Sequence, residues 1–587
     1  MVFPDTATSS TAATPEPLTT SIAGHATSDT VAFTFIDYTT NRDGVAHSYT
    51  WRQLDRRARA VAARLSQVTT RGQRVAVLAP QDLDYVVAFL GALYAGTVAV
   101  PLFAPEVSTH GDRLVGALAD CDPEVWLTSE QALDTVRQLA DGQPVPRPKQ
   151  IIAVDSVDPA LGRDFEPVSV SLDEPAYLQY TSGSTRRPAG AVITHRAVAA
   201  NVAQARHAYG VDETTTFAGW IPFFHDMGLV LLLALPLAVG AHSVFTTPFA
   251  FLRRPMRWLR QLSDYPNVAT AAPNFAYEYA AAKVKPEERS TLDLSNVRVA
   301  CNGSEPVRAG AIEGFLAAFG PHGFAAQAHR PSFGLAEATV FVSTTPAGPP
   351  RITSFDREGL GVRRADPVAD TARGAVRLVS AGVPVGQHVL IVDPDTGAIR
   401  PDNTVGEVWI HGPNVADGYW QQPERSAETF DGRLADGPAD LPARGWLRTG
   451  DLGVYHDGEL YITGRMKDLI IVDGKNHYPH DIEATTQEAH PAIRRDHVAA
   501  FAVAEGDAEA VVVVAEHSRH AEPDQLDPAE VARAVRLAVG EHHDLALHDF
   551  VLTRPGEVLR TSSGKIARAA TRKRYLSGAY RDEEGAR

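Results

Sequence analysis

The chain is poor in cysteine and in lysine. Only Cys121 and Cys301 occur among 587 residues, which excludes a disulfide framework and a cysteine-ligated zinc site. The low cysteine content fits a reducing compartment, so we expect a cytoplasmic protein. Seven lysines stand against 48 arginines, so chemistry that needs a primary amine has few candidates.

Positive charge is in the minority. Lys and Arg total 55 and Asp and Glu total 71, which gives a formal net charge of −16. A general nucleic-acid binder needs a dominant basic field, so this balance excludes that class while leaving room for local basic patches. The hydrophobic content of 44% is that of a globular protein and excludes fibrous and wholly disordered classes.

Long hydrophobic runs are absent as well. The longest, Leu229–Ala241, is interrupted by Pro236 and is shorter than the roughly 20 residues that span a bilayer. We therefore expect a buried helix there and no transmembrane segment. Residues 1–30 are rich in Thr, Ser, Ala and Pro and lack the apolar core of a signal peptide, so we expect a mobile tail.

Short apolar runs alternate with helix-length segments in the first part of the chain. This rhythm is that of βαβ units in a parallel sheet. A Ser/Thr/Gly loop then leads into a helix predicted over His195–Tyr209. The predicted strands are Arg74–Ala79, Thr97–Leu102, Val125–Thr128, Gln150–Val154 and Ala176–Tyr180.

The texture changes to strands and turns after Ala381, which predicts a β-rich subdomain. In the last part, two apolar strands flank Glu505 and a helix begins at Asp527. The predicted fold is α/β: a large domain over 1–466 with two sheet-helix layers and a β-rich subdomain, then a small mobile α+β domain over 467–587. We place the hinge at Lys467.

One loop points to phosphate binding. Residues 180–190 (YTSGSTRRPAG) follow a predicted strand and precede a helix, and their backbone amides are suited to cradle phosphate oxygens. The loop is not a Walker A sequence, because no Gly-Lys-Ser/Thr follows. Taken alone, it is equally compatible with a flexible Ser/Gly loop.

Seven further motifs follow this loop in a fixed order. They are 220–229 (WIPFFHDMGL), 302–306 (NGSEP), 332–337 (SFGLAE), 406–412 (GEVWIHG), 446–451 (WLRTGD), 464–468 (GRMKD) and 562–566 (SSGKI). The series resembles the core motifs of the adenylate-forming superfamily, which includes acyl and aryl CoA ligases, peptide-synthetase adenylation domains and luciferases. The resemblance extends from about Tyr49 to Tyr575.

Within that superfamily the chain most resembles the fatty acyl-AMP ligases of the actinobacterial lipid and polyketide type. The phosphate loop has Arg186 where most members carry Gly and Ala189 where most carry Lys. Residues 470–483 (IIVDGKNHYPHDIE) resemble the characteristic Asn-His-Tyr-Pro stretch of that family. The link over 344–378 is longer than in CoA ligases, as the insertion of that family would be.

The resemblance implies that a fatty acid carboxylate attacks the α-phosphate of ATP to give an acyl-adenylate and pyrophosphate. Both reactants are anions, so positioning and charge neutralisation must supply the rate. Lys565 matches the mobile lysine that bridges the two groups, and His225 matches the gate at the acyl-pocket mouth. Glu337 matches the glutamate that helps to hold Mg²⁺. The alternatives are a solvated lysine, a core histidine and a helix-capping carboxylate.

The resemblance also assigns the nucleotide site. Asp451 matches the acceptor of both ribose hydroxyls with Arg465 beside it, although a structural salt bridge between the two is the competing interpretation. Phe333 matches the ring that stacks on adenine, or else belongs to the core. The full predicted ATP-binding set is Thr181, Ser182, Gly183, Ser184, Thr185, Asn302, Gly303, Ser304, Glu305, Phe333, Gly334, Asp451 and Arg465.

The acyl-pocket wall is predicted from apolar residues near these motifs. The candidates are Phe224, Met227, Asn274, Phe275 and Tyr277, and ordinary core packing is the alternative for each. With Ala189 the pyrophosphate end lacks the positive charge that most members of the superfamily carry there. Either Arg186 or Arg187 replaces that charge, or both are ordinary solvated arginines. The sequence does not define the length, branching or unsaturation of the acyl chain.

We predict a fatty acyl-AMP ligase that passes its acyl group to the phosphopantetheine thiol of an acyl carrier protein. An acyl-CoA ligase is the first alternative, distinguished by consumption of CoA. A catalytically silent acyl-adenylate-binding protein is the second, and retention of Lys565, Glu337, Asp451 and Arg465 argues against it. Carrier proteins are usually acidic, so a basic face on the last helix, with Arg568, Arg572, Lys573 and Arg574, is either a docking face or an ordinary solvated helix end.

Overall fold

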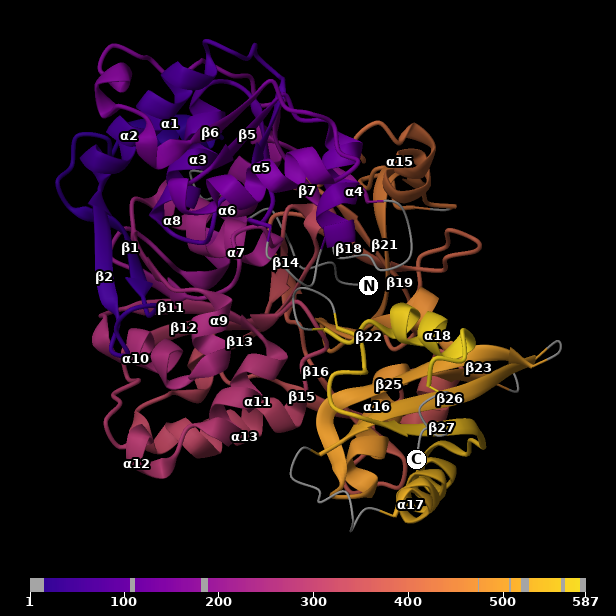
Figure 1. Ribbon diagram of the computed structural model, residues 1–587. Helices are drawn as coiled ribbons and strands as arrows, with labels where there is room; N and C mark the ends of the chain where they lie inside the picture. Colours follow the sequence, from indigo (N-terminus) through magenta and orange to yellow (C-terminus); the bar gives the residue numbers. More distant parts are fainter. Residues whose placement is uncertain are drawn as a thin grey trace.

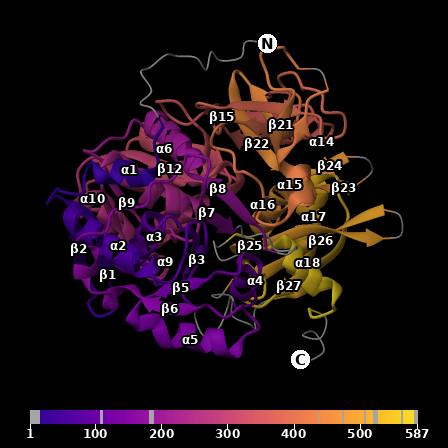
Figure 2. The ribbon, with the colours of Figure 1, turned by 90° about the horizontal axis from the view of Figure 1, so that it is seen from above.

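A computed structural model describes residues 15–105, 111–180, 188–435, 437–472, 475–505, 508–518, 527–560 and 565–580. The chain forms the predicted mixed α/β fold, with a large sheet-helix domain and a smaller C-terminal domain (Figure 1). Seen from above in Figure 2, the small domain lies against one side of the large one. The predicted phosphate-loop residues Thr181, Ser182, Gly183, Ser184 and Thr185, with Arg186 and Arg187, lie outside the described residues.

The first sheet of the large domain has six strands, and all its neighbours pair in parallel except the last two. The predicted βαβ rhythm is therefore confirmed, and the predicted strand bounds hold to within two residues. The order is β6 (Gln150–Ala153), β5 (Val125–Thr128), β3 (Arg74–Val77), β4 (Val98–Pro101), β7 (Pro175–Tyr180) and β8 (Gly190–Thr194). The connecting helices are α2 (Trp51–Leu65), α3 (Leu83–Tyr94), α4 (Gly111–Cys121) and α5 (Leu133–Gly142).

The second sheet has nine strands and, with its helices, supplies much of one wall of the cleft described below. Its central strands are parallel and its two ends are antiparallel. The order is β17 (Val383–Pro384), β14 (Phe341–Thr344), β13 (His329–Gly334), β12 (Val297–Gly303), β11 (Val268–Pro273), β9 (Thr216–Gly219), β10 (His242–Phe245), β1 (Val31–Asp37) and β2 (Val45–Thr50). Its helices include α9 (Pro248–Arg253), α10 (Met256–Asp264), α11 (Asn274–Lys283), α12 (Pro286–Arg289) and α13 (Ala309–Phe319).

Helix α6 (His195–Tyr209) has the predicted bounds. The hydroxyl of Thr194 accepts the Ala197 N–H at its start, and Gly210, with φ 64°, ends it in the left-handed conformation that suits glycine. The helix leads into β9 and the segment 220–229, so it fixes one wall of the later cleft.

The long apolar run is buried, as predicted, but it is not a regular α-helix. It comprises the π-helix η4 (Leu229–Ala234) between α7 (Asp226–Gly228) and α8 (Leu235–Val239). Pro236 has no N–H to give to the Leu232 carbonyl, and the Ser243 hydroxyl donates to that carbonyl instead at 2.7 Å. No helix in the described part of the chain is long and apolar enough to cross a membrane.

The predicted mobile tail is wrong for its second half. Residues 18–23 form α1 (Leu18–Ala23), whose Leu18 and Ile22 are 4% and 1% exposed. These side chains lie four apart, which places them on one face of the helix, and they pack into the main core. His25 follows with its ring 5.1 Å from that of Trp51. Residues 1–14 lie outside the described part.

The predicted β-rich subdomain contains β18 (His388–Val392), β19 (Gly406–His411), β20 (Gly432–Arg433), β21 (Arg444–His456) and β22 (Glu459–Arg465), with α15 (Pro423–Phe430) beside them. The proposed insertion over 344–378 forms a hairpin of β15 (Ile352–Asp356) and β16 (Ala375–Val379) around α14 (Arg357–Gly361). Lys467 lies in the 3₁₀ turn η8 (Met466–Asp468), directly after β22.

The C-terminal domain is α+β. Its three-stranded sheet consists of β25 (Ile493–Glu505), β26 (Ala508–His517) and β27 (Leu547–Thr553), preceded by the hairpin β23 (Ile470–Val472) and β24 (Lys475–His477). Its helices are α16 (Pro479–Ala489), α17 (Pro528–His543) and α18 (Arg568–Leu576). Asp527 caps α17, as its position predicted, by accepting the Ala529 N–H.

Candidate active site

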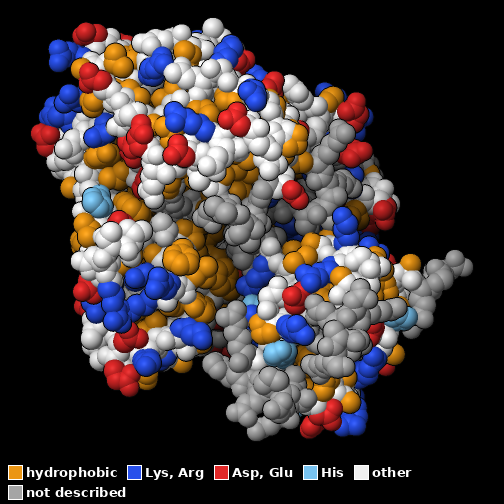
Figure 3. Space-filling view, in the orientation of Figure 1, with side chains coloured by type: hydrophobic (Ala, Val, Ile, Leu, Met, Phe, Trp, Pro, Cys, Tyr) orange, Lys and Arg blue, Asp and Glu red, His pale blue; other side chains and the backbone are white. Residues whose placement is uncertain are grey.

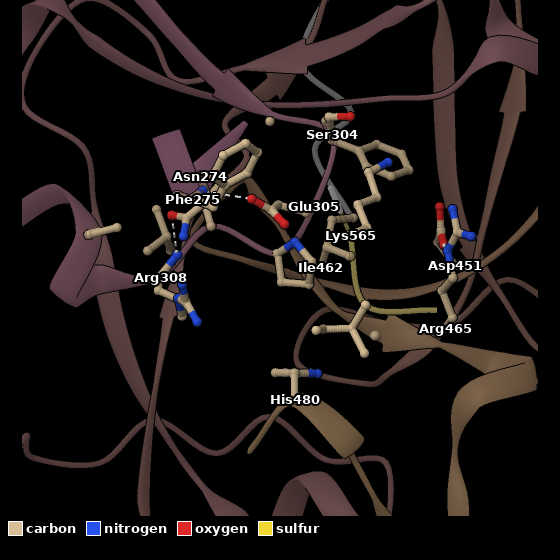
Figure 4. Close-up of a pocket in the computed structure, with 18 of the residues that line it drawn as sticks. Asn274, Phe275, Ser304, Glu305, Arg308, Asp451, Ile462, Arg465, His480 and Lys565 are labelled. Carbon is tan, nitrogen blue, oxygen red and sulfur yellow. Dashed lines mark hydrogen bonds and ion pairs between the residues drawn. The ribbon is translucent and has the colours of Figure 1, made fainter. Parts of the chain in front are cut away.

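A cleft of about 2790 Å³ opens between the two domains (Figures 3 and 4). It brings together residues that lie far apart in the sequence. The predicted site residues that line it are Phe224, His225, Met227, Asn274, Phe275, Gly303, Ser304, Glu305, Phe333, Gly334, Glu337, Asp451, Arg465, Lys467 and Lys565.

Two predicted side chains are not among the residues that line the cleft. Tyr277 is fully buried: its ring lies 5.4 Å from that of Trp258, and its hydroxyl donates to the Cys301 carbonyl at 2.8 Å. Asn302 is buried in β12, with its amide 3.0 Å from His329 Nε2. The structure therefore corrects the prediction for Tyr277, which is a core residue, whereas the nucleotide-binding role of Asn302 stays a prediction.

Lys565 enters the cleft from the C-terminal domain. Figure 4 shows it beside Glu305, with the pair Asp451 and Arg465 across the opening. Burial lowers the pKa of the Lys565 ammonium and Arg465 adds to this, whereas Asp226, Glu305 and Asp451 oppose it. Lys565 thus brings a positive charge into the cleft, within electrostatic range of Asp226, Glu305 and Asp451.

The segment that carries Lys565 is anchored by a buried carboxylate. Glu516 is fully buried and accepts the N–H groups of Gly556 at 2.7 Å and Val558 at 3.0 Å. Its other oxygen lies 2.6 Å from Arg494, whose charge compensates it. The chain from Gly556 toward Lys565 therefore starts from a fixed point in the domain.

His225 and Asp226 form a polar corner on the opposite wall. His225 Nδ1 lies 2.7 Å from Asp226 Oδ1, and the same carboxylate oxygen accepts the Met227 N–H at 2.7 Å, at the start of α7. Burial would raise the pKa of Asp226, but the charges of His225 and Lys565 and these hydrogen bonds lower it overall. Asp226 therefore stays ionised and faces the lysine.

Glu305 and Arg308 join the start of α11 to the C-terminal domain. Glu305 Oε1 accepts the Phe275 N–H at 2.7 Å, and burial raises the pKa of this carboxyl despite that bond and the Arg308 charge. Arg308 pairs with Glu278 and also donates to Asp496 Oδ1 at 2.7 Å. The Arg308–Asp496 contact crosses the cleft and holds the domains in this orientation.

Asp451 and Arg465 are neighbours because β21 and β22 pair in register at these two positions. Arg465 Nε donates to Asp451 Oδ1 at 2.9 Å, and the Asp451 charge raises the pKa of the guanidinium. Asp451 is 5% exposed and lines the cleft. The salt bridge of the competing interpretation is therefore present, and the role of Asp451 toward the ribose stays a prediction.

Glu337 lies on the 3₁₀ turn η7 (Ala336–Ala338) and is half-buried in the cleft wall. The Tyr419 hydroxyl donates to its Oε1 at 2.7 Å. Only glycine fits at the nearby position 334, because a Cβ on Gly334 would clash with the Val340 carbonyl. The carboxylate is thus oriented by a neighbour on a rigid turn.

An apolar branch of the cleft extends beside β12 and β14. The sequence predicted Phe224 and Met227 as residues of this branch. It did not predict the other lining residues, because these are ordinary core residue types on separate elements. The further lining residues are Tyr209, Leu231, Cys301, Val340 and Phe341. Leu231 comes from the π-helix, and the Pro236 within that apolar run was the available signal of irregular helix.

Sequence reasoning also missed Arg113, which lines the cleft from α4. Burial lowers the pKa of its guanidinium. Helix α4 packs closely on the end of the phosphate loop, because a Cβ at Gly116 would lie 2.7 Å from Pro188 Cγ. Arg113 therefore brings a positive charge to the cleft wall from a helix that packs against Pro188.

The hairpin over 352–379 contacts the C-terminal domain directly. Arg357 Nη1 lies 3.4 Å from Asp481 Oδ2 and 3.1 Å from His543 Nδ1. Asn476 donates to the Gly361 carbonyl at 3.2 Å, and Tyr478, 5% exposed, packs in one cluster with apolar residues of the hairpin. These contacts join the hairpin to the C-terminal domain.

Comparison with known proteins shows the family to which the chain belongs. The family model described as AMP-binding enzyme matches residues 22–420, and a second, described as the AMP domain of Disco-interacting protein 2-like proteins, matches residues 467–584. The chain is 45% identical to long-chain-fatty-acid--AMP ligase FadD32 of Mycolicibacterium smegmatis, covering 94% of this chain and 93% of that protein. It is 43% identical to FadD26 of Mycobacterium marinum, covering 94% and 95%.

A solved structure is similar along almost the whole length. The fatty acyl-adenylate ligase from L. pneumophila, in complex with acyl adenylate and pyrophosphate, is 33% identical with a TM-score of 0.74. The match covers 95% of this chain and 96% of that one. The resemblance seen in the motifs thus extends to the whole sequence and fold, and the chain belongs to the long-chain fatty acid--AMP ligases of the AMP-binding enzyme family.

Proposed function

We propose that this enzyme joins the carboxylate of a medium- or long-chain fatty acid to the AMP part of ATP and releases pyrophosphate. It then passes the acyl group to the phosphopantetheine thiol of an acyl carrier protein. The observation that carries the proposal is the position of Lys565, which enters one cleft together with an apolar branch and the Asp451–Arg465 pair. An apolar branch suits an alkyl chain, and the polar end suits a nucleotide.

In the first step a carboxylate oxygen bonds to the α-phosphorus, and the bond from that phosphorus to the β-phosphate oxygen breaks. No proton is transferred. Lys565 neutralises the two approaching anions, and the charges of Asp226 and Glu305 favour its protonated form. Asp451 accepts the ribose hydroxyls, Phe333 covers the adenine, and His225 stands where the acyl chain meets the polar end.

The donor set fits Mg²⁺ rather than a metal held by protein alone. The described residues contain no group of three or more His, Cys, Asp or Glu that would enclose an ion. Mg²⁺ is commonly held by one carboxylate together with phosphates and water, and Glu337 offers such a carboxylate. When bound, the ion neutralises phosphate charge. Arg113 supplies further positive charge toward the pyrophosphate.

In the second step the thiol sulfur bonds to the acyl carbon, the bond to the AMP oxygen breaks, and the thiol proton passes to solvent. The contacts of Arg357 and Tyr478 favour the carrier over CoA, because they oppose the rotation by which a CoA ligase would present its second site. The acyl-CoA ligase alternative predicts no such restraint.

The first half-reaction is tested by ATP–pyrophosphate exchange with a series of saturated fatty acids and no CoA. We expect exchange that depends on the fatty acid and on Mg²⁺, with dodecanoate and longer chains above butanoate. A control without fatty acid sets the background. Exchange that is absent with every fatty acid would contradict the proposal and favour a silent binding protein.

A further inference from the structure

The basic face expected on the last helix is committed to contacts within the molecule. Arg568 pairs with Glu483 at 2.6 Å and Asp468 at 3.2 Å. Arg574 pairs with Glu557, and Arg572 donates to the Ala502 carbonyl at 2.7 Å. Three of the four predicted cations thus have partners within the C-terminal domain, and both interpretations of this face, a docking face and an ordinary solvated helix end, stay open.

A different surface combines positive charge with exposed apolar side chains. On α9, Phe249 is 68% exposed and Leu252 is 47% exposed, which is unusual for large apolar residues on one short helix. Arginines surround them from α9, α10 and the β1–β2 turn. We call this the α9 surface; its residues are Arg42, Phe249, Leu252, Arg253, Arg254 and Arg257.

The arginines of the α9 surface repel one another. Burial lowers the pKa of Arg257, and the charges of Arg254, Arg253 and Arg42 lower it further, with Tyr38 opposing them. Arg254 pairs with Glu288 at 2.8 Å, and Arg257 lies 4.1 Å from the centre of the Tyr38 ring. This group of cations stands on a chain whose net charge is −16, and an acidic partner would complement it.

The α9 surface adjoins the mouth of the cleft. Leu252 lines the cleft together with Tyr279, Lys283 and Arg289, and the Tyr279 hydroxyl donates to the Leu252 carbonyl at 2.8 Å. In Figure 3, blue side chains gather over α9 and α10, with hydrophobic side chains between them and the hollow of the cleft. A partner seated there would hold a flexible arm at the entrance to the site.

We propose that the α9 surface docks the acidic face of the carrier protein, with Phe249 as the apolar contact and the arginines as charge partners. This inference rests on the transfer step proposed above. Charge complementarity identifies the occupant, because an acidic carrier matches a basic patch. Docking at the mouth of the cleft also suits a carrier, because its phosphopantetheine arm must reach into the cleft.

The test uses two variants whose side chains lie outside the cleft, Phe249→Ser and Arg253→Glu. Matched controls are Leu537→Ser on α17, 63% exposed, and Arg137→Glu on α5. Acyl-AMP formation and acyl transfer are measured separately, the latter with a panel of purified holo-carrier domains of differing net charge.

We expect both α9 variants to form acyl-AMP at the wild-type rate and to raise the apparent KM for the carriers by about tenfold, with kcat retained at saturation. The effect of Arg253→Glu should be largest for the most acidic carrier and should shrink in high salt. Unchanged KM values in both variants would overturn the docking surface alone. Wild-type enzyme that makes acyl-AMP but loads none of the carriers would refute the transfer step and the docking surface together.

Discussion

Replacement of Lys565 by alanine should slow adenylation far more than acyl transfer. The ammonium faces Asp226, Glu305 and Asp451, so its loss leaves three carboxylates in the cleft that the fatty acid and ATP must enter. At an effective dielectric of about 20, two unit charges about 4 Å apart interact by about 4 kcal/mol. We therefore expect acyl-AMP formation to fall by about 10²- to 10³-fold, as when one preorganised donor is removed.

The assay follows a single turnover of acyl-AMP formation by quenched-flow mass spectrometry. Transfer is then measured separately from synthetic acyl-AMP to a thiol acceptor. Lys573→Ala is the matched control, since Lys573 is an exposed lysine of the same domain. Adenylation by Lys565→Ala within about threefold of wild type would refute the assigned role.

The same lysine gives a pH dependence with a definite sign. Burial lowers the pKa of Lys565 below its usual 10.5, so the cation is lost as pH rises through that lowered value. The adenylation rate should therefore fall on the alkaline side at a pH below 10.5. Lys565→Arg keeps its positive charge at all these pH values, so the fall in its adenylation rate should occur at a higher pH than in the wild type. A fall in rate at the same alkaline pH in both enzymes would contradict this.

Three further predictions concern the pocket, the metal and stability. Leu231→Trp should shift the preferred acyl chain to shorter lengths, and Leu231→Ala should shift it to longer ones. Each methylene excluded from the pocket is worth about 0.8 kcal/mol, or about fourfold in kcat/KM. Chain-length profiles identical to that of the wild type in both variants would contradict this. Tyr419→Phe removes the hydrogen bond to Glu337, so the Mg²⁺ concentration for half-maximal activity should rise about tenfold, measured by titration of the pyrophosphate-release rate. Burial and the charge of Asp155 raise the pKa of Asp84 to about 6, so the folded state loses stability as pH rises from about 4 through 6. Asp84→Asn should therefore raise the Tm at pH 8 and change it little at pH 4. An equal change in Tm at the two pH values would refute this.

The sheets and helices that frame the site could be predicted because local patterns determine them. The strands of the first sheet are short apolar runs, and α6 carries a cap at Thr194 and a terminating Gly210. Each signal lies within a few residues in the sequence. The positions of Lys565, Glu337 and Asp451 in one cleft followed from motifs that recur in order across a whole family.

The errors fall where tertiary contacts decide. Leu18 and Ile22 are too few to mark a helix in a Thr- and Ser-rich segment, and only the neighbouring core makes α1 stable. Tyr277 lies beside cleft residues in sequence, but it points to the other side of α11, into the core.

The partners of the basic residues on α18 also depend on tertiary contacts. The sequence gives no sign that Arg568 and Arg574 are paired, yet both form ion pairs with carboxylates from other elements. The π-helix at Leu231 and the contribution of Arg113 likewise depend on packing between elements that are distant in the chain. Sequence reasoning has no access to such pairings without a structure.

The most direct test of the account is a product assay with purified enzyme, Mg²⁺-ATP, dodecanoate, excess CoA and a holo-carrier domain, followed over time by mass spectrometry. The account predicts that acyl-AMP and then acyl-carrier accumulate while CoA is not consumed. Formation of acyl-CoA at a rate comparable to acyl-AMP would contradict it and would identify an acyl-CoA ligase.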